Sequence, residues 1–116
     1  MSVAQIMVAA VPTAKKEAYL AHAKQMLPLF RKHGALAVAE NWGVEVPDGE
    51  VTSFPMAVKC KSDETVVVSW IIWPDKATAE AGMGAAMQDT SAMPEGGPPF
   101  DGKRMIFAGF EMLHQT

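Results

Sequence analysis

The fold is decided by the stretch Pro99-Phe100-Asp101-Gly102-Lys103-Arg104-Met105-Ile106-Phe107-Ala108-Gly109-Phe110-Glu111. After the turn that the Asp101-Gly102 pair favours, alternation predicts a strand that starts at Arg104. One face of this strand carries Arg104, Ile106, Ala108, Phe110 and Met112, and the other carries Met105, Phe107, Gly109, Glu111 and Leu113. Because both faces are mainly apolar, other parts of the protein have to cover both of them.

Length and composition predict a single α+β domain over residues 1–116. The chain has 116 residues, of which 49% are hydrophobic and 20% charged, so a core can form without disulfides or metals. The single cysteine, Cys60, excludes an intrachain disulfide and a cysteine-cluster metal site. A reducing compartment fits this cysteine usage, and we therefore expect a cytoplasmic protein.

Charge and hydropathy argue against two classes of partner. The net charge is −3 and the basic residues are scattered, which gives no footprint for a phosphate backbone, so nucleic acid is not expected as a partner. The apolar run from Ile6 to Val11 is too short to span a bilayer, and no basic residue precedes it as in a secretory signal. We expect no membrane association.

The first half of the chain alternates between strand and helix patterns. A strand is predicted over Val3–Val11, followed by a helix that Thr13 caps and Gly34 ends. A second strand is predicted over Ala35–Val44, and Ser53 or Thr52 before Pro55 suggests the start of a short helix.

The second half repeats the pattern. Thr65–Trp73 is rich in β-branched and aromatic residues, which predicts a strand that is apolar on both faces. Asp75 is the expected cap of a helix that runs to about Gln88, although Gly82 and Gly84 weaken it. Thr90–Pro99 is predicted to be a loop able to act as a lid.

The order β-α-β followed by β-α-β is typical of a ferredoxin-like α+β sandwich, in which helices cover one side of an antiparallel sheet. The uncovered side of such a sheet normally carries polar residues, but here it is apolar. A second copy packing sheet to sheet is the simplest cover, so we predict a homodimer, the arrangement known as a dimeric α/β barrel.

Several segments resemble the YbaA-like family of small bacterial proteins. They include Val46-Pro47-Asp48-Gly49, Met56-Ala57-Val58-Lys59, Glu64-Thr65-Val66-Val67 and Pro99-Phe100-Asp101-Gly102-Lys103-Arg104. The resemblance covers nearly the whole chain and implies the dimeric α+β barrel fold. It implies no reaction, because proteins of that superfamily include cofactor-free monooxygenases, haem-degrading enzymes, isomerases and binding proteins.

Glu40 is the first candidate for a functional residue, because its predicted strand face is otherwise apolar. One interpretation is a general base or a ligand-binding carboxylate with a raised pKa, with Trp42 lining the same pocket. The competing interpretation is an ion pair with Arg104 or Lys103. Arg104 is a candidate for binding an anionic group, and Asp101 is a turn residue first and a ligand-binding candidate second.

His22 is the second candidate for an acid or base, because it lies beside the predicted apolar stripe of the first helix. A histidine at the edge of a core, with a satisfied hydrogen bond, is the competing interpretation. No two histidines have the spacing of metal ligands, so we predict neither a metal nor a cofactor.

Three functions remain open from the sequence. The leading hypothesis is a small-molecule-binding or regulatory dimer, whose apolar pocket between sheet and helices is lined by Glu40 and Arg104. The alternative is a cofactor-independent monooxygenase or isomerase that acts on a hydrophobic carbonyl compound, with Glu40 or His22 as proton acceptor. The third is a structural or stress-related dimer without a ligand.

Overall fold

The structure of the chain is a computed structural model that describes residues 1–91 and 97–116. Its elements follow one another as β1 (Val3–Pro12), a short 3-10 turn η1 (Thr13–Lys15), α1 (Lys16–Lys32), β2 (Ala37–Trp42), α2 (Phe54–Ala57), β3 (Glu64–Trp73), α3 (Lys76–Gln88) and β4 (Ile106–Glu111). The predicted lid, Thr90–Pro99, lies partly outside the described residues.

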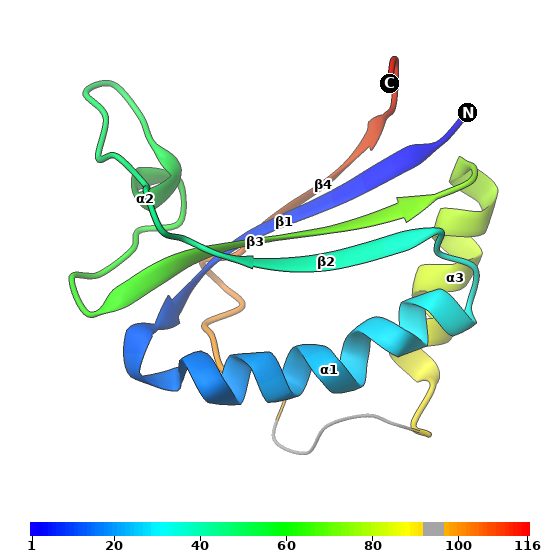
Figure 1. Ribbon diagram of the computed structural model, residues 1–116, viewed down its shortest axis with the longest axis horizontal. Coiled ribbons are helices and arrows are strands. Elements are labelled where there is room, and N and C mark those ends of the chain that lie inside the picture. Colours follow the sequence, from blue (N-terminus) through cyan, green and yellow to red (C-terminus); the bar gives the residue numbers. More distant parts are fainter. Residues whose placement is uncertain (92–96) are drawn as a thin grey trace.

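The strands form one antiparallel sheet in the order β2-β3-β1-β4. Helices α1 and α3 lie on one side of this sheet, and α2 stands on the other side near one end (Figure 1). This order and layering are those of a ferredoxin-like α+β fold, which confirms the predicted fold class.

The core lies between the sheet and the two long helices. One cluster forms around Trp73, whose side chain is fully buried, and comprises Leu29, Phe30, Ala35, Ile71, Trp73, Ala79 and Ala86. A second cluster, nearer the start of α1, comprises Ala9, Val11, Tyr19 and Val67. The odd-numbered residues of β1 and β3 therefore point towards the helices, and the even-numbered ones point away.

The other side of the sheet, called here the outer face, carries one charged residue, Glu64, which begins β3 and pairs with Arg104. The strand registers place on it Ala4, Ile6, Val8 and Ala10 of β1, Ala37, Ala39 and Asn41 of β2, Val66, Val68, Trp70 and Ile72 of β3, and Ile106, Ala108 and Phe110 of β4. Residues 43–60, called here the α2 lobe, cover one end of it by packing Val46, Val58 and Cys60 against Val8, Ala10 and Val66.

Of three predicted helix starts, two are confirmed and one is wrong. Ser53 caps α2 by accepting a hydrogen bond from the Met56 amide (3.1 Å), and Asp75 caps α3 by accepting from the Thr78 amide (2.7 Å), both as expected. The prediction for Thr13 is wrong, because a 3-10 turn precedes α1 and no side chain caps it. The Thr13 hydroxyl instead bonds to that of Thr65 (2.7 Å) at the end of the sheet.

Two predicted strands are shorter than expected. The second spans Ala37–Trp42 rather than Ala35–Val44, and Val44 is exposed. The last begins at Ile106 rather than Arg104, because the Arg104 side chain is engaged in ion pairs at the turn that precedes it. Alternation of apolar residues alone does not mark where backbone pairing stops.

The two glycines inside α3 lead to opposite predictions. A Cβ on Gly82 would lie 2.6 Å from both the Trp73 ring and the His33 carbonyl oxygen, whereas one on Gly84 would meet nothing within 4 Å. We expect Gly82→Ala to destabilise the protein by about 1–3 kcal/mol through overpacking. Gly84→Ala should stabilise it by up to about 1 kcal/mol through helix propensity. Urea unfolding of both variants tests this, and equal effects would contradict it.

Candidate functional site

Glu40 is part of a polar cluster on the helix-facing side of the sheet, midway along the edge strand β2. The strand register places Glu40 of β2 opposite Ser69 of β3. The Tyr19 hydroxyl of α1 donates a hydrogen bond to the Glu40 carboxylate, and Ser69 also bonds to it. These three residues, called here the polar cluster, join the first helix to two neighbouring strands.

Burial controls the proton affinities in the polar cluster. Burial raises the pKa of Glu40, and the hydrogen bonds from Tyr19 and Ser69 offset only part of this effect. Burial, together with the adjacent Glu40 carboxylate, raises the pKa of Tyr19. The tyrosine therefore remains a hydrogen-bond donor, while the carboxyl group holds its proton to a higher pH than an exposed glutamate does.

Aromatic rings enclose the polar cluster. The Tyr19 ring lies 6.2 Å from that of Trp42 and 6.3 Å from that of Phe100, both in tilted geometries. The Lys16 ammonium group lies 5.6 Å from the Trp42 ring centroid, on the solvent side of α1. Trp42 thus contacts the partner of Glu40.

Arg104 and Asp101 belong to a different group of residues, called here the clasp. Two guanidinium nitrogens of Arg104 each lie 2.7 Å from a Glu64 carboxylate oxygen, and its Nε lies 3.1 Å from Asp101 Oδ2. Arg104 also donates to the Lys59 carbonyl (2.9 Å). The predicted Glu40–Arg104 ion pair is therefore wrong, because Arg104 pairs with Glu64, the first residue of β3.

The clasp fixes the turn before β4. The bidentate Arg104 guanidinium lowers the pKa of Glu64 to about 2, so this pair remains charged at neutral pH. Asp101 additionally accepts a hydrogen bond from the Lys103 amide (3.0 Å), which is the turn role expected of it. All three guanidinium nitrogens of Arg104 therefore donate to acceptors of the protein.

His22 and Cys60 lie apart from both groups. His22 is partly buried on α1, and burial lowers its pKa. Cys60 is partly buried in the α2 lobe, where burial and the nearby Glu64 raise the pKa of its thiol, which disfavours the nucleophilic thiolate.

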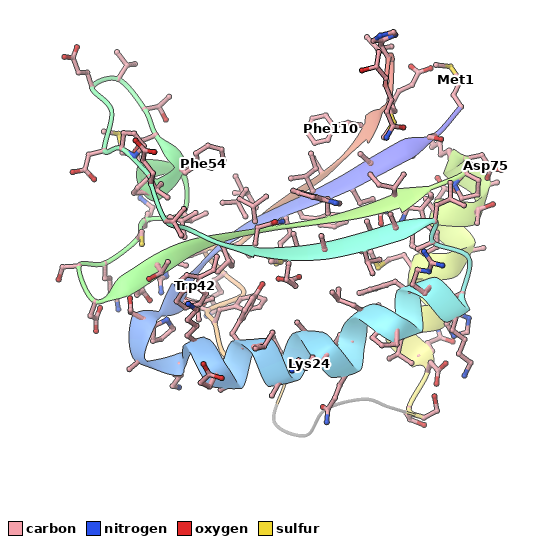
Figure 2. All side chains as sticks on the ribbon, viewed as in Figure 1. Met1, Lys24, Trp42, Phe54, Asp75 and Phe110 are labelled. Atoms are coloured by element: carbon pink, nitrogen blue, oxygen red, sulfur yellow. The ribbon has the colours of Figure 1, made fainter. Side chains whose placement is uncertain are left out.

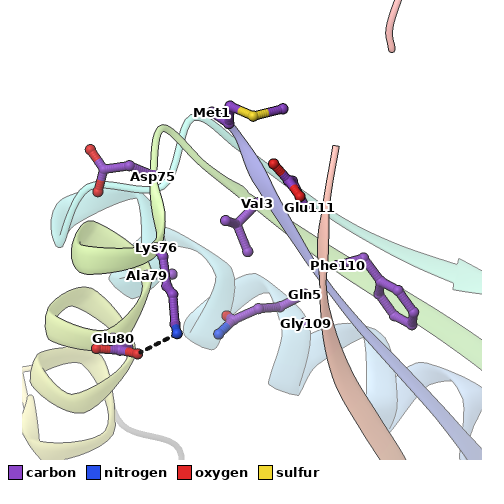
Figure 3. A pocket seen from close by; sticks show the side chains of 10 residues that line it. All are labelled: Met1, Val3, Gln5, Asp75, Lys76, Ala79, Glu80, Gly109, Phe110 and Glu111. Atoms are coloured by element: carbon purple, nitrogen blue, oxygen red, sulfur yellow. Dashed lines mark ion pairs between the residues drawn. The ribbon is translucent and has the colours of Figure 1, made fainter. Parts of the chain in front are cut away.

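A groove on the helix-facing side of the sheet, between α3 and the β1–β4 pair, has a volume of about 510 Å³. Its lining consists of Met1, Val3, Gln5, Asp75, Lys76, Ala79, Glu80, Gly109, Phe110 and Glu111. Figure 3 shows Val3 and Gln5 of β1 facing Lys76 and Glu80 of α3 across this groove. None of the four ligand-binding candidates from the sequence lines it.

Gln5 is the residue of this groove that sequence reasoning missed. Its Oε1 accepts a hydrogen bond from the indole nitrogen of buried Trp73 (2.8 Å). The available signal was a lone amide in an otherwise apolar strand, Val3 to Val11. Because a glutamine side chain has no titratable group, Gln5 does not stand out among the charged candidate residues.

The described residues offer neither a metal cluster nor a membrane-spanning helix. In residues 1–91 and 97–116, no three His, Cys, Asp or Glu side chains come close enough together to hold a metal ion. Within the same ranges, no helix has both the length and the apolar character needed to cross a membrane.

Solved structures with similar folds support the class of protein that the sheet order defines. A crystal structure described as a dimeric ferredoxin-like protein from an uncultured marine organism aligns with a TM-score of 0.59 at 11% identity, over 99% of this chain and 98% of that chain. The designed protein Foldit4 aligns with a TM-score of 0.50 at 12% identity, over 97% and 99% of the two chains. At these identities the two alignments support the fold alone.

The chain belongs to the family described as Protein of unknown function (DUF1428), which matches residues 3–102. It is 49% identical over 108 residues to the protein named "Uncharacterized protein YbaA" of Escherichia coli K12, covering 91% of this chain and 92% of that one. The protein of the same name from Shigella flexneri matches equally well. The resemblance read from the sequence segments is thus confirmed.

The polar cluster generates a prediction about pH. Because the folded-state pKa of Glu40 lies above its ordinary value of 4.5, its contribution to stability is fully present below about pH 4.5 and is lost as the pH rises through the folded-state pKa. Glu40→Gln removes this loss while keeping an acceptor for Tyr19. The stability of Glu40→Gln relative to the wild type, measured by thermal unfolding, should therefore increase between about pH 4 and pH 8.

Glu40→Leu is the contrasting variant, because it leaves the Tyr19 hydroxyl without its acceptor. It should cost about 1–3 kcal/mol at either pH. A Gln variant that is destabilised as much as the Leu variant at high pH would contradict the assignment.

Proposed function

We propose that this chain forms a homodimer through the outer face of its sheet and binds a small, mainly apolar molecule in the groove between α3 and the β1–β4 pair. The observation that carries the proposal is the outer face itself, which is apolar across all four strands. The single cysteine fits a reducing compartment, and the proposal includes a cytoplasmic location.

The outer face has the properties of an interface core. Trp70 of β3 is 40% exposed, and Ile106 and Phe110 of β4 are 45% and 52% exposed. Contiguous apolar patches of this kind are rare on monomers, and interface cores are depleted of charge and enriched in aromatic residues. A second copy of the same face is self-complementary across a two-fold axis, without any further element.

The α2 lobe supports the same arrangement. It rises beside the open part of the outer face, and the labelled Phe54 projects from its sheet side (Figure 2). Phe54 is 54% exposed, so the lobe provides a further apolar surface for a partner's sheet. The marine relative in fold is described as dimeric, which agrees with this proposal.

The groove supports the binding part of the proposal. It lies on the helix-facing side of β4, a strand that the two long helices leave largely open, and Phe107 on that side is half exposed. Phe110, which lines the groove, belongs to the outer face. The groove therefore opens at the border of the proposed interface, so that the dimer would influence access to it.

An enzyme with Glu40 or His22 as proton acceptor is the alternative. Neither residue lines this groove, and the Glu40 carboxylate is bonded to Tyr19 and Ser69. The polar cluster and the clasp act in this proposal as positioning groups. The polar cluster anchors α1 on the sheet, and the clasp fixes the start of β4, which is one wall of the groove.

Trp70→Asp tests the dimer. A buried carboxylate at the centre of the interface should raise the dimer dissociation constant by at least about thirtyfold, the loss expected for an aromatic residue worth about 2 kcal/mol. Light scattering coupled to size-exclusion chromatography measures it. Leu20→Asp, at a similarly exposed position on α1, is the matched control and should leave the dimer intact. A wild-type monomer at micromolar concentration contradicts the proposal.

Gly109→Leu tests the groove. Gly109 lies on the helix-facing side of β4, and an added Cβ would meet only Gln5 Cγ, at 4.0 Å, so a leucine fits the strand and fills the groove. Amide NMR with a library of small apolar fragments should give shifts at Val3, Gln5 and Ala79 that Gly109→Leu abolishes. Gly84→Ala, which lies in open space, is the control. A library without such hits would favour a structural dimer.

A further inference from the structure

The side-chain oxygen of Gln5 accepts a hydrogen bond from Trp73, whereas its NH₂ group is directed at the groove. An indole N–H can only donate, so the atom of Gln5 that faces Trp73 Nε1 has to be the oxygen. The amide NH₂ group is thereby turned the other way, and in the described part of the chain no protein atom accepts a hydrogen bond from it. Figure 3 shows this end of Gln5 directed across the groove towards Lys76.

The neighbours of Gln5 leave space for a ligand over its amide. Its partner on β4 is Gly109, which has no side chain, and Val3 and Ala79 add apolar surface nearby. Gln5 itself is fixed by the bond to Trp73, whose ring is fully buried. The groove thus has an apolar lining and one pre-oriented hydrogen-bond donor at its base.

Charge around the groove excludes anions as preferred ligands. Asp75, Glu80 and Glu111 contribute three carboxylates, against two ammonium groups: that of Lys76, which lies 3.9 Å from Glu80, and the amino terminus at Met1. A carboxylate or phosphate would meet net repulsion on entering. An ammonium group at the base would meet the Gln5 NH₂ group, which is itself a donor and offers it no acceptor.

We infer that the groove recognises an uncharged apolar compound through a carbonyl oxygen, which accepts a hydrogen bond from Gln5 Nε2. This inference rests on the proposed binding function and adds the ligand class. A carbonyl oxygen is an acceptor only, and it matches a fixed amide donor without the cost of desolvating a charge.

Three probes with the same ring system test the ligand class: acetylnaphthalene, naphthoate and naphthylmethylammonium. Titration followed by amide NMR, including the Gln5 side-chain NH₂ signal, gives the affinity of each. Acetylnaphthalene should bind at least about tenfold more tightly than either charged probe, a difference of about 1.4 kcal/mol. It should also shift the Gln5 side-chain signal.

Gln5→Glu separates recognition from packing. A glutamate keeps an acceptor for Trp73 Nε1 but has no NH₂ group, so the indole N–H resonance should persist while the affinity for acetylnaphthalene falls by at least about tenfold. Gly109→Leu should abolish binding of all three probes. Gly84→Ala should change nothing.

Each outcome decides one point. Binding of a charged probe at Val3, Gln5 and Ala79 with equal or higher affinity overturns the ligand class and leaves the proposed binding function standing. Unchanged affinity for acetylnaphthalene in Gln5→Glu, with the indole signal retained, also overturns the role of Gln5. If no probe and no library fragment perturbs these residues, both the ligand class and the binding function fail.

Discussion

Two long helices cannot cover both sides of a four-stranded sheet, and this constraint governs the rest of the structure. Helices α1 and α3 bury the side that carries Trp73 and Val67, while the outer face keeps Trp70 and Phe110 accessible. The α2 lobe covers only one end of that face. The hydrophobic effect therefore leaves a large unsatisfied surface, from which the proposed dimer follows.

The polar groups on the helix-facing side serve packing before chemistry. Tyr19 and Ser69 supply hydrogen bonds to Glu40, and Gln5 supplies one to the Trp73 indole. In each case one polar side chain in the core satisfies the hydrogen-bonding group of another. Gln5 alone retains a donor beyond that task, which is why the proposed ligand contact centres on it rather than on the more conspicuous Glu40.

Much of the fold could be predicted because its signals are local. The β-branched and aromatic run at Thr65–Trp73 and the caps at Ser53 and Asp75 act within a few residues of themselves. The site could not be predicted in the same way. Arg104 seemed a partner for Glu40, but it pairs with Asp101, three residues away, and with Glu64, which only the fold brings close from 40 residues away.

The sequence by itself determined the element order, the ferredoxin-like class and the apolar character of both sheet faces, because periodicity and composition are properties of neighbouring residues. The resemblance of its segments to known proteins indicated the family. Only the tertiary structure decided that Glu40 is enclosed by Tyr19 and Ser69, that Arg104 closes a clasp, and that Gln5 and Gly109 meet at a groove. Such meetings are set by strand register and by the distance between helix and sheet, and no local pattern encodes these quantities.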